Sequence, residues 1–153
     1  AEKIINLGYE KIILNNVCFS NFNLVNELRK NLGAQSIIIS LDIVNVGQNY
    51  FFYNYLDKKN RKESIEEQLK KINKVEVGEI MLTSVSYDGM MTGCDLNLIN
   101  KYQNLIDVPI IYRGGLSSLE NIKEVFNTNV SAITSSKDGF QAVKSSPVRR
   151  TRA

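Results

Sequence analysis

Histidine and tryptophan are both absent from the 153-residue sequence, which also has only two prolines and two cysteines. Without histidine there can be no histidine general base, no histidine-based triad and no histidine-bearing metal site, so carboxylates become the leading acid–base candidates. The two cysteines, Cys18 and Cys94, cannot build a disulfide framework, and we therefore expect a reducing, cytoplasmic environment. No apolar run reaches the roughly 20 residues that a membrane-spanning helix needs, so we expect no membrane partner.

Basic residues are in slight excess, with a formal net charge of +3, but they gather near the C-terminal end. Residues 137–153 hold five basic residues and one acidic residue, whereas the remainder of the chain is nearly neutral. A nucleic-acid interface would place its basic residues on the folded part. We therefore predict a folded domain over residues 1–136, a basic tail over residues 137–153 that is disordered or extraneous to the domain, and no nucleic-acid partner.

Short apolar runs alternate with helical segments along the predicted domain. Strands are predicted at Lys11–Leu14, Ile37–Leu41, Glu79–Thr83, Val108–Tyr112 and Ser131–Thr134. Helix starts are predicted at Ser20 or Asn21, Ser64 with Glu67, Asp95, and Ser117 with Glu120. Residues 46–53 favour a hairpin, and the charged residues 57–63 favour a solvated loop. Strands that alternate with helices predict an α/β fold with a parallel sheet.

Two architectures accommodate five such units. A flavodoxin-like open sheet would be complete at this length, whereas a (β/α)8 barrel needs about 250 residues, so the pattern alone favours the open sheet. In both architectures, ligands bind at the carboxyl ends of the parallel strands. The polar and glycine residues at these ends are Asn15, Asn16, Asp42, Thr83, Asp88, Gly89, Gly114, Gly115, Ser135 and Ser136.

These strand ends favour phosphate binding and acid–base chemistry. Glycine after a strand lets backbone N–H groups approach an anion closely, so several such loops at equivalent strand ends favour a phosphate site over a set of plain turns. Asp42 directly follows an apolar run, where an ionised carboxylate is costly unless it is hydrogen-bonded or functional. We therefore predict a functional role for Asp42.

The segment Glu79–Asp95, EIMLTSVSYDGMMTGCD, resembles the signature of HisF, the cyclase subunit of imidazole glycerol phosphate synthase. The segments LGYEKIILNN, LGAQSIIISLD, VPIIYRGG and VSAITSS agree with this family in order and spacing. The resemblance covers about residues 1–136 and implies the fourth to eighth strands of a (β/α)8 barrel. We therefore expect a partial TIM barrel, a fragment that is inactive alone and that dimerises or aggregates.

The resemblance also implies an enzyme, a lyase of histidine biosynthesis that takes ammonia from a glutaminase partner and needs no cofactor or metal. Asp42 matches one of the family's two catalytic aspartates. Substrate and phosphate contacts are implied for Asn15, Asn16, Thr83, Asp88, Gly89, Gly114, Gly115, Ser135 and Ser136. Lys11 and Glu79 match an ammonia gate at the opposite barrel opening, although a surface ion pair explains them equally well, and Glu10 matches a glutaminase-facing position.

Some residues depart from the family pattern. Arg113 precedes the Gly114–Gly115 pair where a small residue is usual, and Tyr87 replaces a basic residue. These departures suit a HisF-like paralogue that supplies ammonia for sugar amidation in surface-polysaccharide synthesis. A third hypothesis, from a different class, is a complete α/β module that binds phosphate without catalysis.

Overall fold

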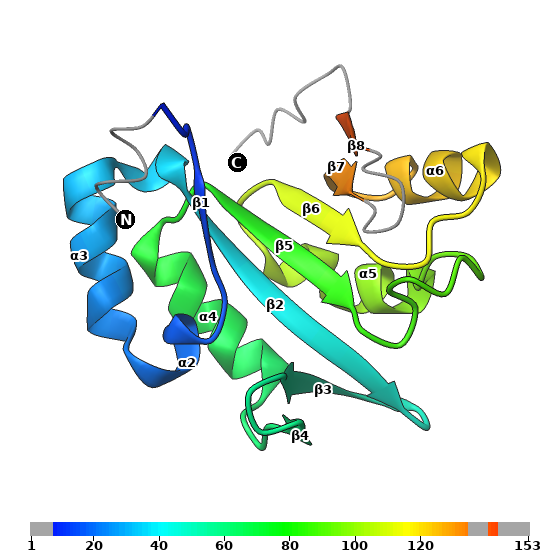
Figure 1. Cartoon of the computed structure of the whole chain (residues 1–153), viewed down its shortest axis with the longest axis horizontal. Coiled ribbons are helices and arrows are strands. Elements are labelled where there is room, and N and C mark those ends of the chain that lie inside the picture. The colour runs from blue at the N-terminus through cyan, green and yellow to red at the C-terminus, as the bar shows by residue number, and fades with distance from the viewer. Residues whose placement is uncertain (1–7, 135–140, 144–153) are drawn as a thin grey trace.

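The computed structural model describes residues 8–134 and 141–143 of the chain (Figure 1). The described strands are β1 (Ile12–Leu14), β2 (Ile37–Val46), β3 (Asn49–Asn54), β4 (Lys59–Asn60), β5 (Glu79–Ser84), β6 (Ile110–Arg113), β7 (Val130–Thr134) and β8 (Gln141–Val143). The described α-helices are α2 (Val17–Ser20), α3 (Phe22–Leu32), α4 (Ile65–Val75), α5 (Leu96–Tyr102) and α6 (Leu119–Phe126). Short 3-10 turns lie at Ala34–Ser36 and Gln103–Leu105.

Five of these strands run parallel in the order β1-β2-β5-β6-β7. Each parallel strand therefore lies beside the next one along the chain, as Figure 1 shows. A flavodoxin-like sheet would reverse its strand order at a switch point, whereas a (β/α)8 barrel adds its strands in sequence. The observed order excludes the flavodoxin-like alternative and matches part of a barrel whose sheet is open.

Strand β2 is longer than the sequence predicts. The apolar run ends at Asp42, but the strand continues to Val46 and turns at Gly47 into β3. The prediction that Asp42 ends the strand is therefore wrong, because antiparallel pairing with β3 extends β2 beyond its apolar part. Strand β1 pairs with residues 37–39 and β3 with residues 43–46, so the two share one edge of β2 while β5 occupies the other.

The two faces of the sheet have different partners. The helix face consists of strand residues that pack against α3–α6 and are fully buried: Ile37, Ile39, Leu41, Ile43, Ile80, Leu82, Ile110 and Tyr112. The cavity face consists of the alternate residues, which lie outside this core: Ile13, Ile38, Ser40, Asp42, Met81, Thr83 and Arg113. Burial of the helix face against four helices holds the sheet together.

Side-chain caps start most of the helices where the sequence predicts them. Asn21 accepts a hydrogen bond from the backbone of Leu24, and Ser64 accepts one from the backbone of Glu67. The prediction that Ser117 caps α6 is wrong, because Ser118 adopts the extended conformation and accepts the bond from Asn121. Two adjacent serines offer the same side chain, and the backbone of the preceding loop decides between them.

Asp95 caps α5 and also joins three other segments. Its carboxylate, 3% exposed, accepts hydrogen bonds from the Leu98 backbone, from the Tyr50 hydroxyl of β3 and from the Ser84 hydroxyl of β5. Its own backbone N–H donates to the hydroxyl of Tyr112 in β6. This buried carboxylate is thus fully paired, and it fixes the hairpin and α5 against the end of the sheet.

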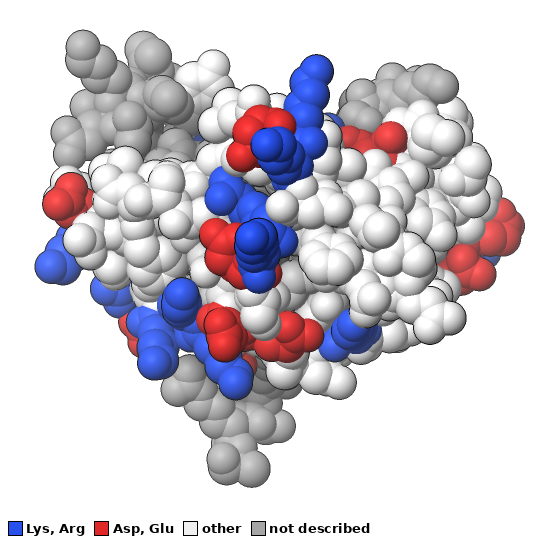
Figure 2. Space-filling model, turned by 90° about the horizontal axis from the view of Figure 1, so that it is seen from below, with Lys and Arg blue, Asp and Glu red and all other residues white. Residues whose placement is uncertain are grey.

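Little of the predicted basic tail falls within the described residues. Residues 141–143 form β8, which pairs antiparallel with β7, and the rest of residues 137–153 lies outside the described part. Over the described residues of the face drawn in Figure 2, basic and acidic side chains are interspersed. Among the described residues, no helix combines the length and the apolar character needed to cross a membrane.

Candidate active site at the carboxyl end of the sheet

A cavity of about 320 Å³ lies over the cavity face, towards the carboxyl ends of the parallel strands. It is lined by Ile13, Asn15, Ser40, Asp42, Tyr55, Met81, Thr83, Asp88 and Arg113. Parallel pairing places Asp42 beside Thr83 and Thr83 beside Arg113, so these three side chains form one layer across β2, β5 and β6. Four predicted site residues, Asn15, Asp42, Thr83 and Asp88, therefore meet in one place.

Asp42 is a buried carboxylate, 8% exposed, with a short hydrogen bond. The side-chain amide of Asn15, in the loop after β1, donates to its Oδ2 at 2.6 Å. Burial raises the pKa of Asp42 above its usual range, while the Asn15 bond, the nearby Thr83 hydroxyl and the Arg113 charge oppose that rise. A carboxyl with a raised pKa can hold or release a proton closer to neutral pH.

Thr83 completes the environment of this carboxyl. The side-chain oxygen of Thr83 is buried, and among the described residues it has no partner within hydrogen-bonding geometry. The hydroxyl still lies near enough to Asp42 to lower the pKa of that carboxyl. Thr83 therefore retains hydrogen-bonding capacity that a bound ligand could use.

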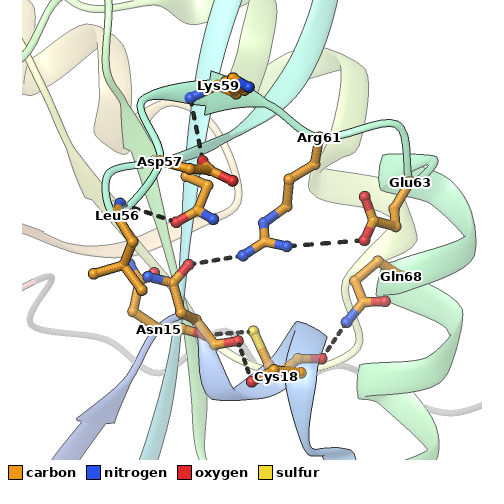
Figure 3. A network of polar contacts seen from close by, with 11 residues as sticks. Asn15, Cys18, Leu56, Asp57, Lys59, Arg61, Glu63 and Gln68 are labelled. Carbon is orange, nitrogen blue, oxygen red and sulfur yellow. Dashed lines mark hydrogen bonds and ion pairs between the residues drawn. The ribbon is translucent and has the colours of Figure 1, made fainter.

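The next predicted residue, Asn16, points to a different partner from its neighbour Asn15. Its side-chain oxygen accepts a hydrogen bond of 3.0 Å from Nη2 of Arg61, which follows β4. Arg61 also lies 3.9 Å from Glu63, as Figure 3 shows, and 4.4 Å above the Phe19 ring centroid. The expectation that residues 57–63 form a solvated loop is therefore wrong for Arg61, which ties the hairpin to α2 and to the loop after β1.

The predicted glycines follow the cavity-lining residues Asp88 and Arg113. Gly89 has a φ of +77°, a conformation that glycine adopts without steric cost. A Cβ on Gly115 would collide with the backbone oxygen of Gly93, and one on Gly114 would lie 2.9 Å from the Ser84 oxygen. Close packing of the β6 loop against the β5 loop therefore requires these glycines. The phosphate role remains a prediction, and Ser135 and Ser136 lie outside the described residues.

Lys11 and Glu79 lie at the other end of the sheet, where the parallel strands begin. Their side chains form an ion pair with an N–O distance of 2.8 Å across the start of β2. Glu10 is exposed in the segment before β1. The geometry brings the predicted gate residues together, two residues before Ile13 and Met81, which line the cavity at the end nearest this ion pair.

Sequence reasoning did not assign Arg113 and Tyr55 to the site. Nη2 of Arg113 lies 3.1 Å from Oδ2 of Asp88, within the cavity. Burial raises the pKa of the Tyr55 phenol, and Asp42 and Asp88 raise it further. Arg113 could have been found from the sequence, because it is a charged residue at the end of an apolar strand. Tyr55 has no such signal, since it reaches the cavity only because the hairpin folds back.

Comparison with known proteins places the chain in a family. The model of the family described as "Histidine biosynthesis protein" matches residues 1–138. The chain is 33% identical to the imidazole glycerol phosphate synthase subunit HisF of Prochlorococcus marinus, over 80% of the chain and 49% of that protein. It is 32% identical to the HisF subunit of Thermococcus onnurineus, over 85% of the chain and 52% of that protein.

A third relative is the "Putative imidazole glycerol phosphate synthase subunit hisF2" of Campylobacter jejuni, which is 31% identical over 86% of the chain and 52% of that protein. The chain therefore spans about half the length of the curated relatives it matches. Its five ordered parallel strands agree with part of a TIM barrel. The chain belongs to the histidine biosynthesis protein family and, within it, to the HisF type.

Proposed function

We propose that the complete natural protein containing this chain is the cyclase subunit of imidazole glycerol phosphate synthase. It takes ammonia from a glutaminase partner and converts N′-phosphoribulosylformimino-aminoimidazole-carboxamide ribotide into imidazole glycerol phosphate and aminoimidazole-carboxamide ribotide, as a lyase. The observation that carries the proposal is the buried Asp42 carboxyl, held by Asn15 in a polar cavity of a HisF-type sheet.

Asp42 acts as a general acid or base in this proposal. Its pKa is raised by burial, which brings the carboxyl closer to the pH at which it can exchange protons. The Asn15 amide fixes Oδ2 of the carboxylate, and in this proposal Oδ1 exchanges the proton with the substrate. The HisF resemblance implies a second aspartate, on the family's first strand, which the fourth to eighth strands do not include, so Asp42 supplies one half of the pair.

The substrate's phosphates bind around the rim of the cavity. We assign one phosphate to the loop ends at Gly114, Gly115, Ser135 and Ser136, with Asp88 and Gly89 in the adjoining loop. We assign the other to the neighbourhood of Asn15 and Asn16. Thr83 lines the pocket between these regions.

Ammonia enters at the opposite end of the sheet. The Lys11–Glu79 ion pair lies there, so opening that pair would uncover the amino ends of the strands. Glu10 is exposed next to it and faces the glutaminase. An exposed or half-exposed ion pair contributes only about 0–1 kcal/mol, so a partner can break it at little cost.

Growth rescue tests this function. The complete natural protein should restore histidine-independent growth to a strain that lacks its own cyclase. Asp42→Asn should lower turnover about 10²–10⁴-fold, because the amide cannot exchange the proton, while substrate binding stays largely intact. The matched control is Asp57→Asn, which removes the same charge from the hairpin, outside the cavity lining. Turnover of Asp42→Asn within a few-fold of the unaltered protein would refute the catalytic assignment.

A HisF-like paralogue that supplies ammonia for sugar amidation in surface-polysaccharide synthesis is the second candidate. Arg113 favours it, because a large cation occupies a position in the cavity where the resemblance implies a small residue. A well-expressed complete protein that fails to rescue growth, yet still releases ammonia from glutamine with its partner, would support this candidate over the first.

A further inference from the structure

Arg113 occupies an unusual position for a cation. It ends β6 in the same layer as Asp42 and Thr83, and its side chain, 38% exposed, reaches the cavity. Of the described residues that line this cavity, Arg113 has the single positive charge, and Asp42 and Asp88 have the negative ones. An anionic ligand group entering here would be repelled by the two carboxylates unless Arg113 bound it.

The present partner of Arg113 can be exchanged. Asp88 lies in the loop after β5, and its Oδ2 lies 3.1 Å from Nη2 of the guanidinium. The Arg113 side chain is 38% exposed, and solvent weakens an ion pair of this exposure. A ligand phosphate or carboxylate that met both guanidinium nitrogens would gain a stronger, bidentate interaction.

A second feature of the cavity is the hydrogen-bonding capacity of Thr83. Among the described residues, the buried Thr83 oxygen has no partner within hydrogen-bonding geometry, and it lies between Asp42 and Arg113 in the layer. A buried hydroxyl of this kind is stabilised when a ligand atom forms a hydrogen bond with it. An oxyanion could therefore bind both the Thr83 hydroxyl and the Arg113 guanidinium.

We propose that Arg113 is an oxyanion-binding residue, which exchanges Asp88 for a phosphate or carboxylate group of a ligand bound beside Asp42. The inference rests on the proposed function only in taking this cavity as the ligand site. The cyclase substrate has two phosphates and no carboxylate, and both phosphates are assigned above to the rim of the cavity. An anion bound by Arg113 is therefore a further group, which favours the second candidate function and a different ligand.

Ligand binding to the complete natural protein tests this inference. Inorganic phosphate and acetate serve as separate probes, and NMR signals from the methyl groups of Met81 and Thr83 report binding inside the cavity. One or both anions should shift these signals. Arg113→Ser should lower the affinity for that anion about tenfold to a hundredfold. Arg113→Lys keeps the positive charge but loses the planar guanidinium group, so its affinity for the anion should be intermediate. Asp88→Asn should increase the affinity, because it removes the competing carboxylate.

Arg29→Ser is the matched control, because Arg29 pairs with Glu76 on the helix layer and its loss changes net charge equally. It should leave both titrations unchanged. A response to phosphate alone identifies a phosphate ester, and a response to acetate alone identifies a carboxylate. The proposal is overturned if neither anion shifts the signals, or if Arg113→Ser or Arg113→Lys binds as tightly as the unaltered protein. These readouts do not involve turnover, so a failure of the cyclase function would show separately, in the Asp42→Asn assay.

Discussion

The helix face and the cavity face of the sheet differ in the polarity and the burial of their residues. On the helix face, the core residues of β2, β5 and β6 are aliphatic or tyrosine apart from Ser84, and they are buried against α3–α6. The cavity face includes the polar residues Ser40, Asp42 and Thr83 beside apolar ones, and Ile13 remains 56% exposed. The first face stabilises the fold, and the second holds polar groups whose burial costs stability.

The contrast is sharpest within β2, where successive residues point to opposite faces. Leu41 and Ile43 are fully buried in the core, whereas Asp42 between them is buried in the cavity with a raised pKa. An ionised carboxylate in such a place is tolerated because Asn15 pairs with it. The stability gained on one face thus permits a buried carboxylate on the other.

Shortening one side chain on each face should give the largest difference in the free energy of unfolding. Leu82→Ala removes a fully buried helix-face side chain and should lower the free energy of unfolding by about 2–5 kcal/mol. Ile13→Ala removes a half-exposed side chain from the cavity face and should cost less than about 1 kcal/mol. Urea denaturation of the 153-residue chain measures both values.

The same pair of variants in the complete natural protein sharpens this comparison. If further strands pair there with the edge of β1 that no described strand occupies, Ile13→Ala should become more costly while Leu82→Ala stays the same. Equal costs for the two substitutions in the 153-residue chain would contradict the assignment of the core to the helix face alone.

Sequence reasoning succeeded where structure depends on local signals. The apolar runs predict all five parallel strands, and Asn21, Ser64 and Asp95 cap the helices as predicted. The extension of β2 beyond Asp42 was missed, since it depends on pairing with β3 rather than on hydrophobic pattern. Strand order was left open between two architectures, because alternation fixes the units but not their neighbours.

The site shows the same division. Asp42 and Thr83 could be predicted from their places at the ends of apolar runs, and both line the cavity. Asn15 was predicted in the same way, but its pairing with Asp42 was not, because the two lie 27 residues apart and meet only through strand register. Arg61 was misjudged for a similar reason, since a charged run gives no sign that one member packs on Phe19.

A moderate effect on stability is expected from loss of the hydrogen bond between Asn15 and the buried Asp42 carboxylate. Asn15→Ala removes the hydrogen bond to Asp42 and should destabilise the complete natural protein by about 1.5–3 kcal/mol at neutral pH. The pKa of Asp42 should rise further, because burial then acts with less opposition. A raised folded-state pKa favours folding below the unfolded pKa and loses that contribution as pH rises through the folded value.

The destabilisation by Asn15→Ala should therefore shrink on acidification, when the carboxyl is protonated in both proteins, and denaturation at several pH values measures this trend. Asn16→Ala is the matched control, since its partner is Arg61 and its cost should not follow the titration of Asp42. A pH-independent cost for Asn15→Ala would mean that the amide supports the loop and leaves the carboxyl unaffected.

The smallest expected effect lies in the helix layer, at the start of α6. Ser118→Ala removes the side-chain oxygen that caps the Asn121 backbone and should cost about 1 kcal/mol. Ser117→Ala removes an exposed hydroxyl that bonds to the Asn121 side chain and should change stability by less than about 0.5 kcal/mol. Both substitutions are on the helix side, so neither should alter anion binding or the pH dependence set by Asp42. A larger cost for Ser117→Ala would place the helix start one residue earlier and restore the spacing that the sequence alone favours.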